Sequence, residues 1–233
     1  MTAMLNSLEE LTQRARAESW DYPKYLQQLC EVEWEARHGR KLERLLKGSR
    51  LPEGKTLATL DEMKLTAKLR RTLAQLVEGG FVERCENVVA FGLPGRGKTH
   101  FLCAIGHELI LRHQYRVYFT PTFKLVQQLL EAKAQLKLEA LLKKLDRFDL
   151  VILDDLGYVK QTREEMEVLF TFIAERYERR SLMISSNRVF SEWDQIFHDP
   201  MTAMAAVDRL VHHSVLLEFS GSSYRAAKKK AKA

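Results

Sequence analysis

The stretch FGLPGRGKTH (residues 91–100) contains the pattern G-x-x-x-x-G-K-[ST] without a gap. The pattern positions are Gly92, Gly97, Lys98 and Thr99. In such a loop, glycines let successive backbone N–H groups turn inward around phosphate oxygens, the lysine reaches the β- and γ-phosphates, and the hydroxyl ligates Mg²⁺. The pattern predicts a nucleotide phosphate site formed by Gly92, Leu93, Pro94, Gly95, Arg96, Gly97, Lys98, Thr99 and His100.

The residues on either side of this loop favour that interpretation over a chance match in a glycine-rich turn. NVVAF (87–91) is a short apolar run typical of a buried strand, and THFLCAIGHELILRH (99–113) has a helical pattern. A helix that begins at the loop adds the anion-binding property of its N-terminus. Strand, loop and helix are the context that phosphate binding needs.

From residue 87 onward, further strand-like runs alternate with helical patterns. This alternation predicts an α/β fold in which a parallel sheet is covered by helices on both faces. The strands are expected at 87–91, 116–120, 149–153, 181–186 and 214–219. The helices are expected to include 122–145 and 163–178.

Residues 1–50 and the run after Thr59 have helical patterns, and Gly48 and Pro52 separate the two. A helix often begins with Ser or Thr followed three residues later by Glu, an arrangement called a capping box. Capping boxes are therefore expected at Ser7–Glu10, Thr59–Glu62 and Thr162–Glu165.

The composition of the 233 residues fits a large domain, or a domain with an appendage, that can bury a core. No apolar run approaches the roughly 18 residues of a membrane span, and no signal peptide is visible. The three widely spaced cysteines predict reduced thiols in a cytoplasmic protein. The net charge of +6 argues only weakly for DNA, because the tail YRAAKKKAKA (224–233) contains five cations and no acid.

Two acidic residues follow a buried strand in LVILDD (150–155). Asp154 is placed to hold Mg²⁺, and Asp155 to act as general base toward an attacking water. The alternative is a simple helix cap before LGY. The next strand ends in ISSNR, where Asn187 is expected to face the γ-phosphate and orient water, or to be an ordinary turn residue.

Two arginines near the C-terminus are further candidates. Arg209 lies in AVDRLVHH (206–213) among apolar neighbours, and Arg225 ends GSSYR (221–225). In a ring-forming ATPase, Arg209 would reach the phosphate of a neighbouring subunit and Arg225 would contact the nucleotide of its own subunit. Both could equally be solvated or acid-paired helix residues.

A cationic stripe is expected in RHGRKLERLLKGSR (37–50), where basic residues recur at helical spacing and Glu43 is the only acid. Such a stripe suits the phosphates of duplex DNA, and the alternative is a solvated helix face. The residues of the stripe are Arg37, Arg40, Lys41, Arg44 and Lys47.

Several of these segments together resemble the IstB-type AAA+ ATPases, the helper proteins of bacterial insertion sequences. The resemblance covers roughly residues 35–226, and the chain is more distantly similar to the DnaC-type helicase loaders. The segments that carry it are GLPGRGKTH, DDLGY, FTFIAERYERRSLMISSNRVFSEWDQIFHDP, DRLVHH and GSSYR.

The resemblance implies an AAA+ ATPase domain at 59–226 with a five-stranded sheet in the order 5-1-4-3-2. It implies a helical DNA-binding or oligomerisation region at 1–58, and the basic tail is left at 227–233. It further implies ATP and Mg²⁺ as cofactors, and duplex DNA, an integrase-type transposase and further copies of this chain as partners. By the same resemblance, Asn187 corresponds to sensor 1, Arg209 to an arginine finger and Arg225 to sensor 2.

One residue departs from the AAA+ pattern: Asp155 stands where most of these ATPases have Glu. The shorter carboxylate leaves slow hydrolysis, or an ATP-gated DNA clamp without hydrolysis, as variants of the same function. Two other functions remain alternatives, a replicative helicase loader and a small-molecule P-loop kinase. The kinase would have no use for a basic N-terminal helix.

Overall fold

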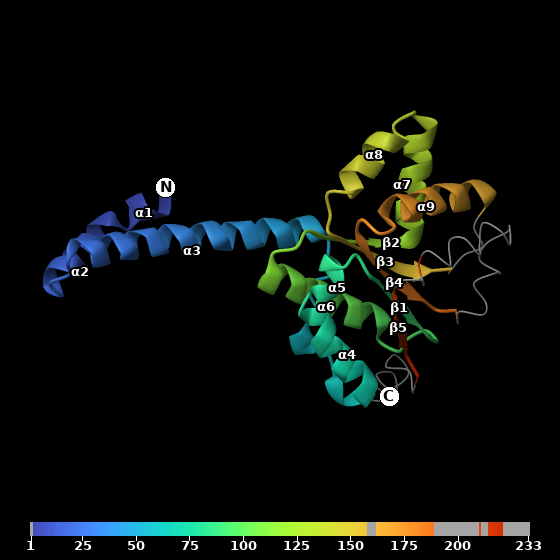
Figure 1. The fold of residues 1–233 in the computed structure, drawn as a ribbon, viewed down its shortest axis with the longest axis horizontal. Coiled ribbons are helices and arrows are strands. Elements are labelled where there is room, and N and C mark those ends of the chain that lie inside the picture. Colours follow the sequence, from blue (N-terminus) through green and yellow to red (C-terminus); the bar gives the residue numbers. More distant parts are fainter. Residues whose placement is uncertain (1, 158–161, 189–209, 211–213, 221–233) are drawn as a thin grey trace, which may run out of the picture. The chain divides into compact units, whose positions relative to one another are not determined.

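The structure is a computed structural model that describes residues 2–157, 162–188, 210 and 214–220. The chain divides between Lys47 and Gly48 into two compact units (Figure 1).

The first unit consists of helices α1 (Thr2–Asn6) and α2 (Leu8–Ala17) and most of α3 (Tyr22–Ser49). Leu11 and Leu29 are buried in it, and the Thr12 hydroxyl lies 2.7 Å from the Tyr25 hydroxyl, which joins α2 to α3. The capping box expected at Ser7 is wrong, because the Ser7 side chain makes no cap hydrogen bond. Instead, the Ser7 N–H donates to the Ala3 carbonyl, so the chain is already helical there.

The segment between α3 and the sheet packs with the second unit. Leu51 is buried, and His107 Nε2 lies 3.2 Å from the Pro52 carbonyl oxygen. For this reason the compact units divide earlier than the boundary expected after residue 58. The functions expected for residues 1–58 stay predictions.

Two short 3₁₀ turns, Leu57–Thr59 and Glu62–Lys64, precede the next helix. The capping box expected at Thr59–Glu62 is therefore wrong. Thr56 and Thr59 form a box around the first turn, and the Thr66 hydroxyl caps α4 (Ala67–Val77) by accepting from Leu69 N–H at 3.2 Å.

The rest of the second unit alternates strands with helices, as expected. In chain order the elements after α4 are α5 (Gly80–Glu83), β1 (Asn87–Phe91), α6 (Lys98–His113), β2 (Val117–Pro121), α7 (Thr122–Ala134), α8 (Leu138–Leu145), β3 (Leu150–Leu156), α9 (Arg163–Arg176), β4 (Ser181–Ser186) and β5 (Ser214–Glu218).

The strands form one parallel sheet in the order β2-β3-β4-β1-β5. This is the predicted order, counted from the other edge, and it is confirmed. Because β4 lies between β1 and β3, the end of β4 separates the loop after β1 from the acids at the end of β3. All three strand ends meet at one edge of the sheet.

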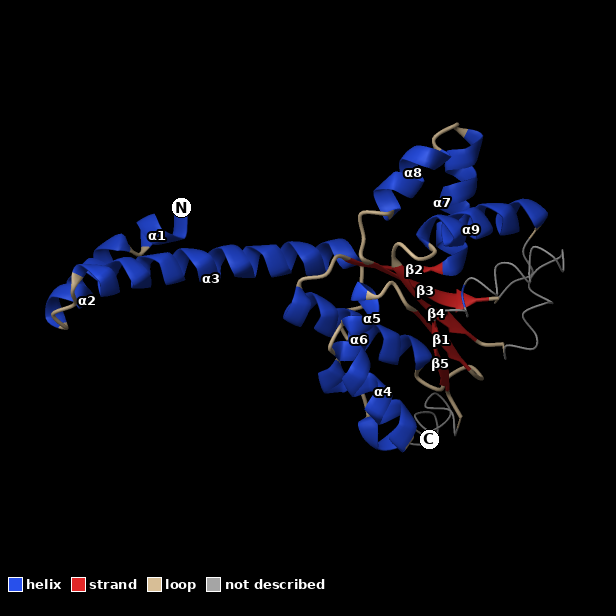
Figure 2. Ribbon diagram, in the orientation of Figure 1, coloured by secondary structure: helices blue, strands red, loops and turns tan. Residues whose placement is uncertain are grey.

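Helices cover both faces of this sheet (Figure 2). Helix α6 packs on one face, with α4 against it, and α7 contacts β2 and β3 on the other face together with α9. The strands are near-continuous apolar runs because both of their faces are buried. The core therefore holds the strand ends in a fixed arrangement.

The expected single helix at 122–145 is wrong. It breaks between α7 and α8, where Leu136 has a left-handed backbone (φ 57°). The two halves fold back on each other, and Leu138, Leu141 and Leu142 pack against the core. The box at Thr162 is confirmed, since its hydroxyl accepts from Glu165 N–H and the Glu165 carboxylate accepts from Thr162 N–H.

Candidate nucleotide-binding site

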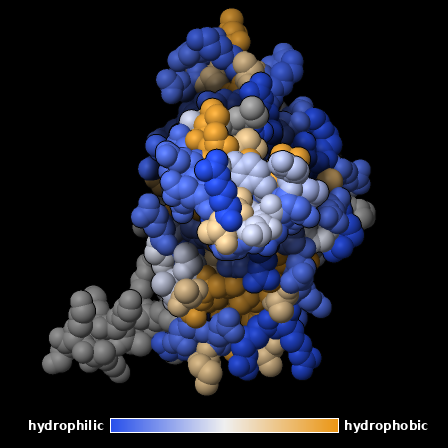
Figure 3. Space-filling model, turned by 90° about the vertical axis from the view of Figure 1, so that its left-hand side faces the viewer, coloured by the Kyte–Doolittle hydropathy of each residue, from blue (hydrophilic) through white to orange (hydrophobic). Residues whose placement is uncertain are grey.

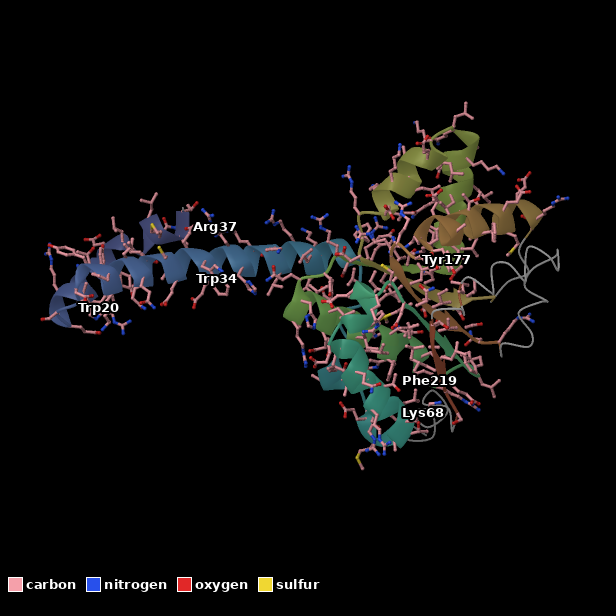
Figure 4. All side chains as sticks on the ribbon, in the orientation of Figure 1. Trp20, Trp34, Arg37, Lys68, Tyr177 and Phe219 are labelled. Atoms are coloured by element: carbon pink, nitrogen blue, oxygen red, sulfur yellow. The ribbon has the colours of Figure 1, made fainter. Side chains whose placement is uncertain are left out.

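The loop between β1 and α6 depends on glycines with positive φ. Gly92, Gly95 and Gly97 have φ values of 140°, 80° and 88°, a region that other residues rarely adopt. A Cβ on Gly92 would also clash with the carbonyl oxygen of Phe219, just after β5. Phe219 in turn donates its N–H to the Phe91 carbonyl at 2.9 Å, so the loop lies directly against the end of β5 (Figure 4).

Lys98 is buried at the first turn of α6, with 5% of its surface exposed. Its ammonium donates to the carbonyl oxygens of Gly92 and Leu93 at 2.7 and 3.0 Å, and to Asn187 Oδ1 at 2.8 Å. A buried cation needs such partners. These bonds hold the Lys98 charge inside the loop, at the N-terminus of α6, where an anion is favoured.

The acids Asp154 and Asp155 lie at a bulge at the end of β3. The pairing of β3 with β4 shifts register between Leu153 and Leu156, and Asp155 has a left-handed backbone (φ 67°). In a regular strand, neighbouring side chains point to opposite faces, and a bulge changes this direction. Both carboxylates consequently contact side chains of the same site.

Each of these carboxylates has its own partners. Asp154 Oδ1 accepts from the Thr99 hydroxyl at 2.7 Å and from the Ser185 hydroxyl at 2.6 Å. Asp155 Oδ1 accepts from Asn187 Nδ2. Asn187 thereby joins the buried ammonium of Lys98 to the carboxylate of Asp155, and the predicted residues from three strand ends form one connected network.

The donor set fits a nucleotide with Mg²⁺. The Thr99 hydroxyl and the Asp154 carboxylate are adjacent oxygen groups of the kind that bind Mg²⁺, beside a glycine loop at a helix N-terminus. Within the described part of the chain, no group of three or more His, Cys, Asp and Glu residues could hold a metal ion. Mg²⁺ suits such a site because it binds through one or two protein oxygens plus phosphates and water.

Burial also determines the protonation state of the Cys103 thiol, one turn after Thr99 in α6. Removal from water raises the pKa of this thiol to about 12. The thiol therefore stays protonated near neutral pH and is no nucleophile for the site.

Two residues of the predicted phosphate site, Arg96 and His100, contact other segments of the second unit. Arg96 Nη1 donates to the Phe219 carbonyl at 2.8 Å, which fastens the loop to the end of β5. His100 Nε2 lies 3.0 Å from the Thr59 hydroxyl and 3.1 Å from the Thr56 carbonyl oxygen. Nucleotide contacts by Arg96 and His100 stay predictions.

Ser185 belongs to the network but is absent from the sequence-based site. Its hydroxyl donates to Asp154 and accepts from Asp155 N–H at 2.8 Å. The available signal was its spacing, since residues two apart in a strand share a face and Ser185 stands two residues before Asn187.

The remaining predicted site residues are two arginines and the cations of the α3 stripe. Arg209 and Arg225 fall outside the described residues. The five cations of the α3 stripe are all exposed, and Figure 4 labels Arg37 among them. Arg37 Nε lies 2.7 Å and Arg40 Nη2 4.0 Å from Glu33 Oε1, so two of the five share an acid that the sequence interpretation left out.

The fold and the site define a P-loop nucleotide-binding protein of the AAA+ class. The parallel sheet has the predicted order, and the glycine loop, Lys98, Thr99 and the β3 acids meet at its edge. More particularly, the chain belongs to the family of IstB-like ATP binding proteins, whose model matches residues 1–233.

Relatives with similar sequences are named insertion-sequence ATP-binding proteins. The chain is 42% identical to an insertion-sequence ATP-binding protein of Sinorhizobium fredii, over 93% of this chain and 72% of that one. It is 37% identical to an insertion-sequence ATP-binding protein of Pseudomonas aeruginosa, over 96% of this chain and 84% of that one.

Solved structures with low sequence identity share the fold. The crystal structure of DnaI has a TM-score of 0.60 at 19% identity, and covers 74% of this chain and 96% of its own. That of the DnaC helicase loader has a TM-score of 0.56 at 21% identity, with 67% and 92% covered. AMPPCP-bound DnaA from Aquifex aeolicus has a TM-score of 0.58 at 22% identity, with 79% and 56% covered.

The described helices include none with the length and apolar character needed to cross a membrane. The molecular face in Figure 3 is mostly hydrophilic where its residues are coloured.

Proposed function

We propose that this protein is an ATP-dependent helper of insertion-sequence transposition, which assembles on duplex target DNA and stimulates an integrase-type transposase. The observation that carries the ATPase part is the network from Lys98 through Asn187 to Asp155, beside the Thr99–Asp154 pair. The names of the relatives from Sinorhizobium fredii and Pseudomonas aeruginosa support the transposition part.

In this proposal Lys98 leaves its carbonyl partners for the phosphates of ATP, whose negative charge attracts it more strongly than neutral carbonyl groups do. Thr99 and Asp154 would hold Mg²⁺, which supplies charge neutralisation at the phosphate oxygens. The N-terminus of α6 contributes backbone N–H groups to the same phosphates.

For hydrolysis, Asp155 would take the proton of the attacking water as general base. Asn187 restrains this carboxylate through Nδ2, and its Oδ1 is bound to Lys98. The amide therefore keeps the base in place while the ammonium faces the phosphates. Arg225 would contact the nucleotide of its own subunit, and Arg209 that of a neighbour.

Each expected region of the chain has its own function in this proposal. Residues 1–58 would bind DNA and support self-assembly, 59–226 would bind and hydrolyse ATP, and the tail 227–233 would add phosphate affinity. The exposed α3 stripe supports DNA binding by residues 1–58. Its members Lys41, Arg44 and Lys47 form no ion pair with another described residue.

A replicative helicase loader is the second candidate, because the DnaC helicase loader has a similar fold. We favour the transposition helper, since a likeness at 21% identity concerns the fold alone, whereas the sequence relatives share up to 42% identity. A small-molecule kinase would have to transfer phosphate to a metabolite without any need for DNA.

The test measures ATP hydrolysis by the purified protein with and without duplex DNA, and with Lys98→Ala as a blank for contaminating ATPases. Stimulation by DNA is expected. Pull-downs against an integrase-type transposase and against a replicative helicase then separate the two partners. Hydrolysis that ignores DNA, together with phosphoryl transfer to a metabolite, would establish the kinase instead.

A further inference from the structure

Ser185 lies near the end of β4, between the loop strand β1 and the acidic strand β3. Only 1% of its surface is exposed. A serine hydroxyl has one proton to donate, and here it goes to Asp154 Oδ1, because the second partner of the hydroxyl is itself an N–H group, that of Asp155. The directions of both hydrogen bonds are therefore fixed.

The first bond selects one oxygen of Asp154. The hydroxyls of Ser185 and Thr99 both donate to Oδ1, at 2.6 and 2.7 Å. Among the described residues no hydrogen bond to Oδ2 is formed, so this oxygen can face a metal ion or its water. With two donors on Oδ1, the carboxylate cannot rotate freely about its terminal bond.

The second bond holds the backbone of Asp155. Its φ of 67° is left-handed, a conformation that costs free energy in a residue with a side chain. The N–H of Asp155 donates to Ser185 Oγ at 2.8 Å, across the point where the β3–β4 register shifts. One hydroxyl thus bridges the side chain of Asp154 and the backbone of Asp155.

We propose that Ser185 is a positioning residue, which sets the Asp154 carboxylate for Mg²⁺ and keeps the bulge that turns Asp155 into the same site. The role in Mg²⁺ binding rests on the proposed function. The role at the bulge does not, because it rests on the register shift and on the hydrogen bond from Asp155 N–H to Ser185 Oγ.

The test compares Ser185→Ala with Ser186→Ala. Ser186 is a matched control, since it is buried in the same strand and its hydroxyl also donates once and accepts once, to the Leu156 carbonyl and from Arg188 N–H. Its partners are not the two acids. Both variants lose two hydrogen bonds and are expected to lose similar thermal stability.

Two measurements separate the variants. The Mg²⁺ concentration that half-maximally enhances ATP binding is expected to rise roughly tenfold in Ser185→Ala and to stay unchanged in Ser186→Ala, as found when the hydrogen-bond partner of a metal ligand is removed. Without any nucleotide, hydrogen exchange at the Asp155 amide is expected to accelerate only in Ser185→Ala. Ser185→Thr keeps the hydroxyl and should restore both properties.

An equal shift of Mg²⁺ dependence in the two alanine variants, or none in Ser185→Ala, would overturn the positioning role. If Ser185→Ala does not fold, Ser185→Cys retains a weak donor and should give a smaller shift in the same direction. A wild-type protein that binds ATP with Mg²⁺ but does not hydrolyse it would contradict the proposed ATPase activity. The Mg²⁺ dependence of ATP binding and the hydrogen exchange at the Asp155 amide would still test the positioning role of Ser185.

Discussion

The ammonium of Lys98 donates a hydrogen bond to Asn187 Oδ1 at 2.8 Å, across the space between the end of β1 and the end of β4. The side-chain amide of Asn187 must then turn its nitrogen away, and this nitrogen donates to Asp155. A change in the position of Lys98 on phosphate binding would therefore be transmitted to Asp155, the proposed general base, through the side chain of Asn187.

Lys98→Ala is expected to weaken ATP binding at least 10- to 100-fold, because charge-assisted hydrogen bonds to the phosphates are lost. Isothermal titration with ATP and Mg²⁺ measures this. Lys68→Ala is the matched control, since Lys68 is an exposed lysine of α4 and should leave affinity unchanged (Figure 4). An unchanged dissociation constant for Lys98→Ala would remove the nucleotide role of the loop.

Asp155→Asn is expected to bind ATP normally but to hydrolyse it about 10²- to 10⁴-fold more slowly, since an amide cannot act as general base. Asn tolerates the left-handed backbone of position 155 and retains an oxygen for the bond from Asn187. The fold should persist, which a melting curve checks. Turnover at the wild-type rate would mean that Asp155 is only a structural residue.

The cations of the α3 stripe are expected to contribute unequally to DNA binding. Lys41→Ala with Arg44→Ala should reduce the slope of log affinity against log salt by about two units, because two phosphate contacts disappear. Arg37→Ala with Arg40→Ala should reduce it less, since both side chains already face the Glu33 carboxylate. Binding titrations from low to high salt measure the slopes.

ATP affinity should survive in both pairs of substitutions, which separates DNA binding from the nucleotide site. Equal slopes in wild type and in both variants would return the stripe to a solvated helix face. Attention would then move to the tail lysines at 227–233.

Arg209→Ala is expected to bind ATP yet fail to hydrolyse it, because an arginine supplied by a neighbouring subunit can accelerate phosphoryl transfer by several orders of magnitude. The decisive experiment mixes Arg209→Ala with Lys98→Ala, each inactive alone. In a mixed assembly, an Arg209→Ala subunit has an intact nucleotide site and can be completed by Arg209 of a neighbouring Lys98→Ala subunit. Partial recovery of ATP hydrolysis is therefore expected. If ATP hydrolysis does not recover although the two variants co-assemble, Arg209 acts within its own subunit and not on a neighbour.

The sequence predicted the parallel sheet from its apolar runs and one specific loop pattern, and it predicted the strand order through the resemblance to the IstB-type ATPases. It also predicted that Lys98, Thr99, Asp154, Asp155 and Asn187 would meet. Parallel strands end at the same edge, so residues at the ends of three neighbouring strands must lie close together. Such conclusions need topology only, and no side-chain detail.

Other features depend on geometry that pattern alone does not contain. The bulge at Asp155 requires a register shift against β4, and the break at Leu136 requires two helices to pack against each other. The expected cap at Thr59 was wrong because a 3₁₀ turn at Glu62–Lys64 delays the start of α4, and Thr66 caps that helix instead. The acid beside the cationic stripe, Glu33, lies one helical turn before Arg37 and therefore outside the basic segment 37–50.

The position of β1 in the sheet has a consequence for how the protein is made. β1 pairs only with β4 and β5 among the described strands, in registers such as Val88 with Met183 and Val88 with Val215. A ribosome therefore releases the nucleotide loop long before it has synthesised either strand that holds it. During that interval β1 is an apolar strand with two open edges, a state prone to aggregation. Acquisition of ATP affinity would accordingly mark the synthesis of β4 and β5, and nascent chains that end before β4 should need a chaperone.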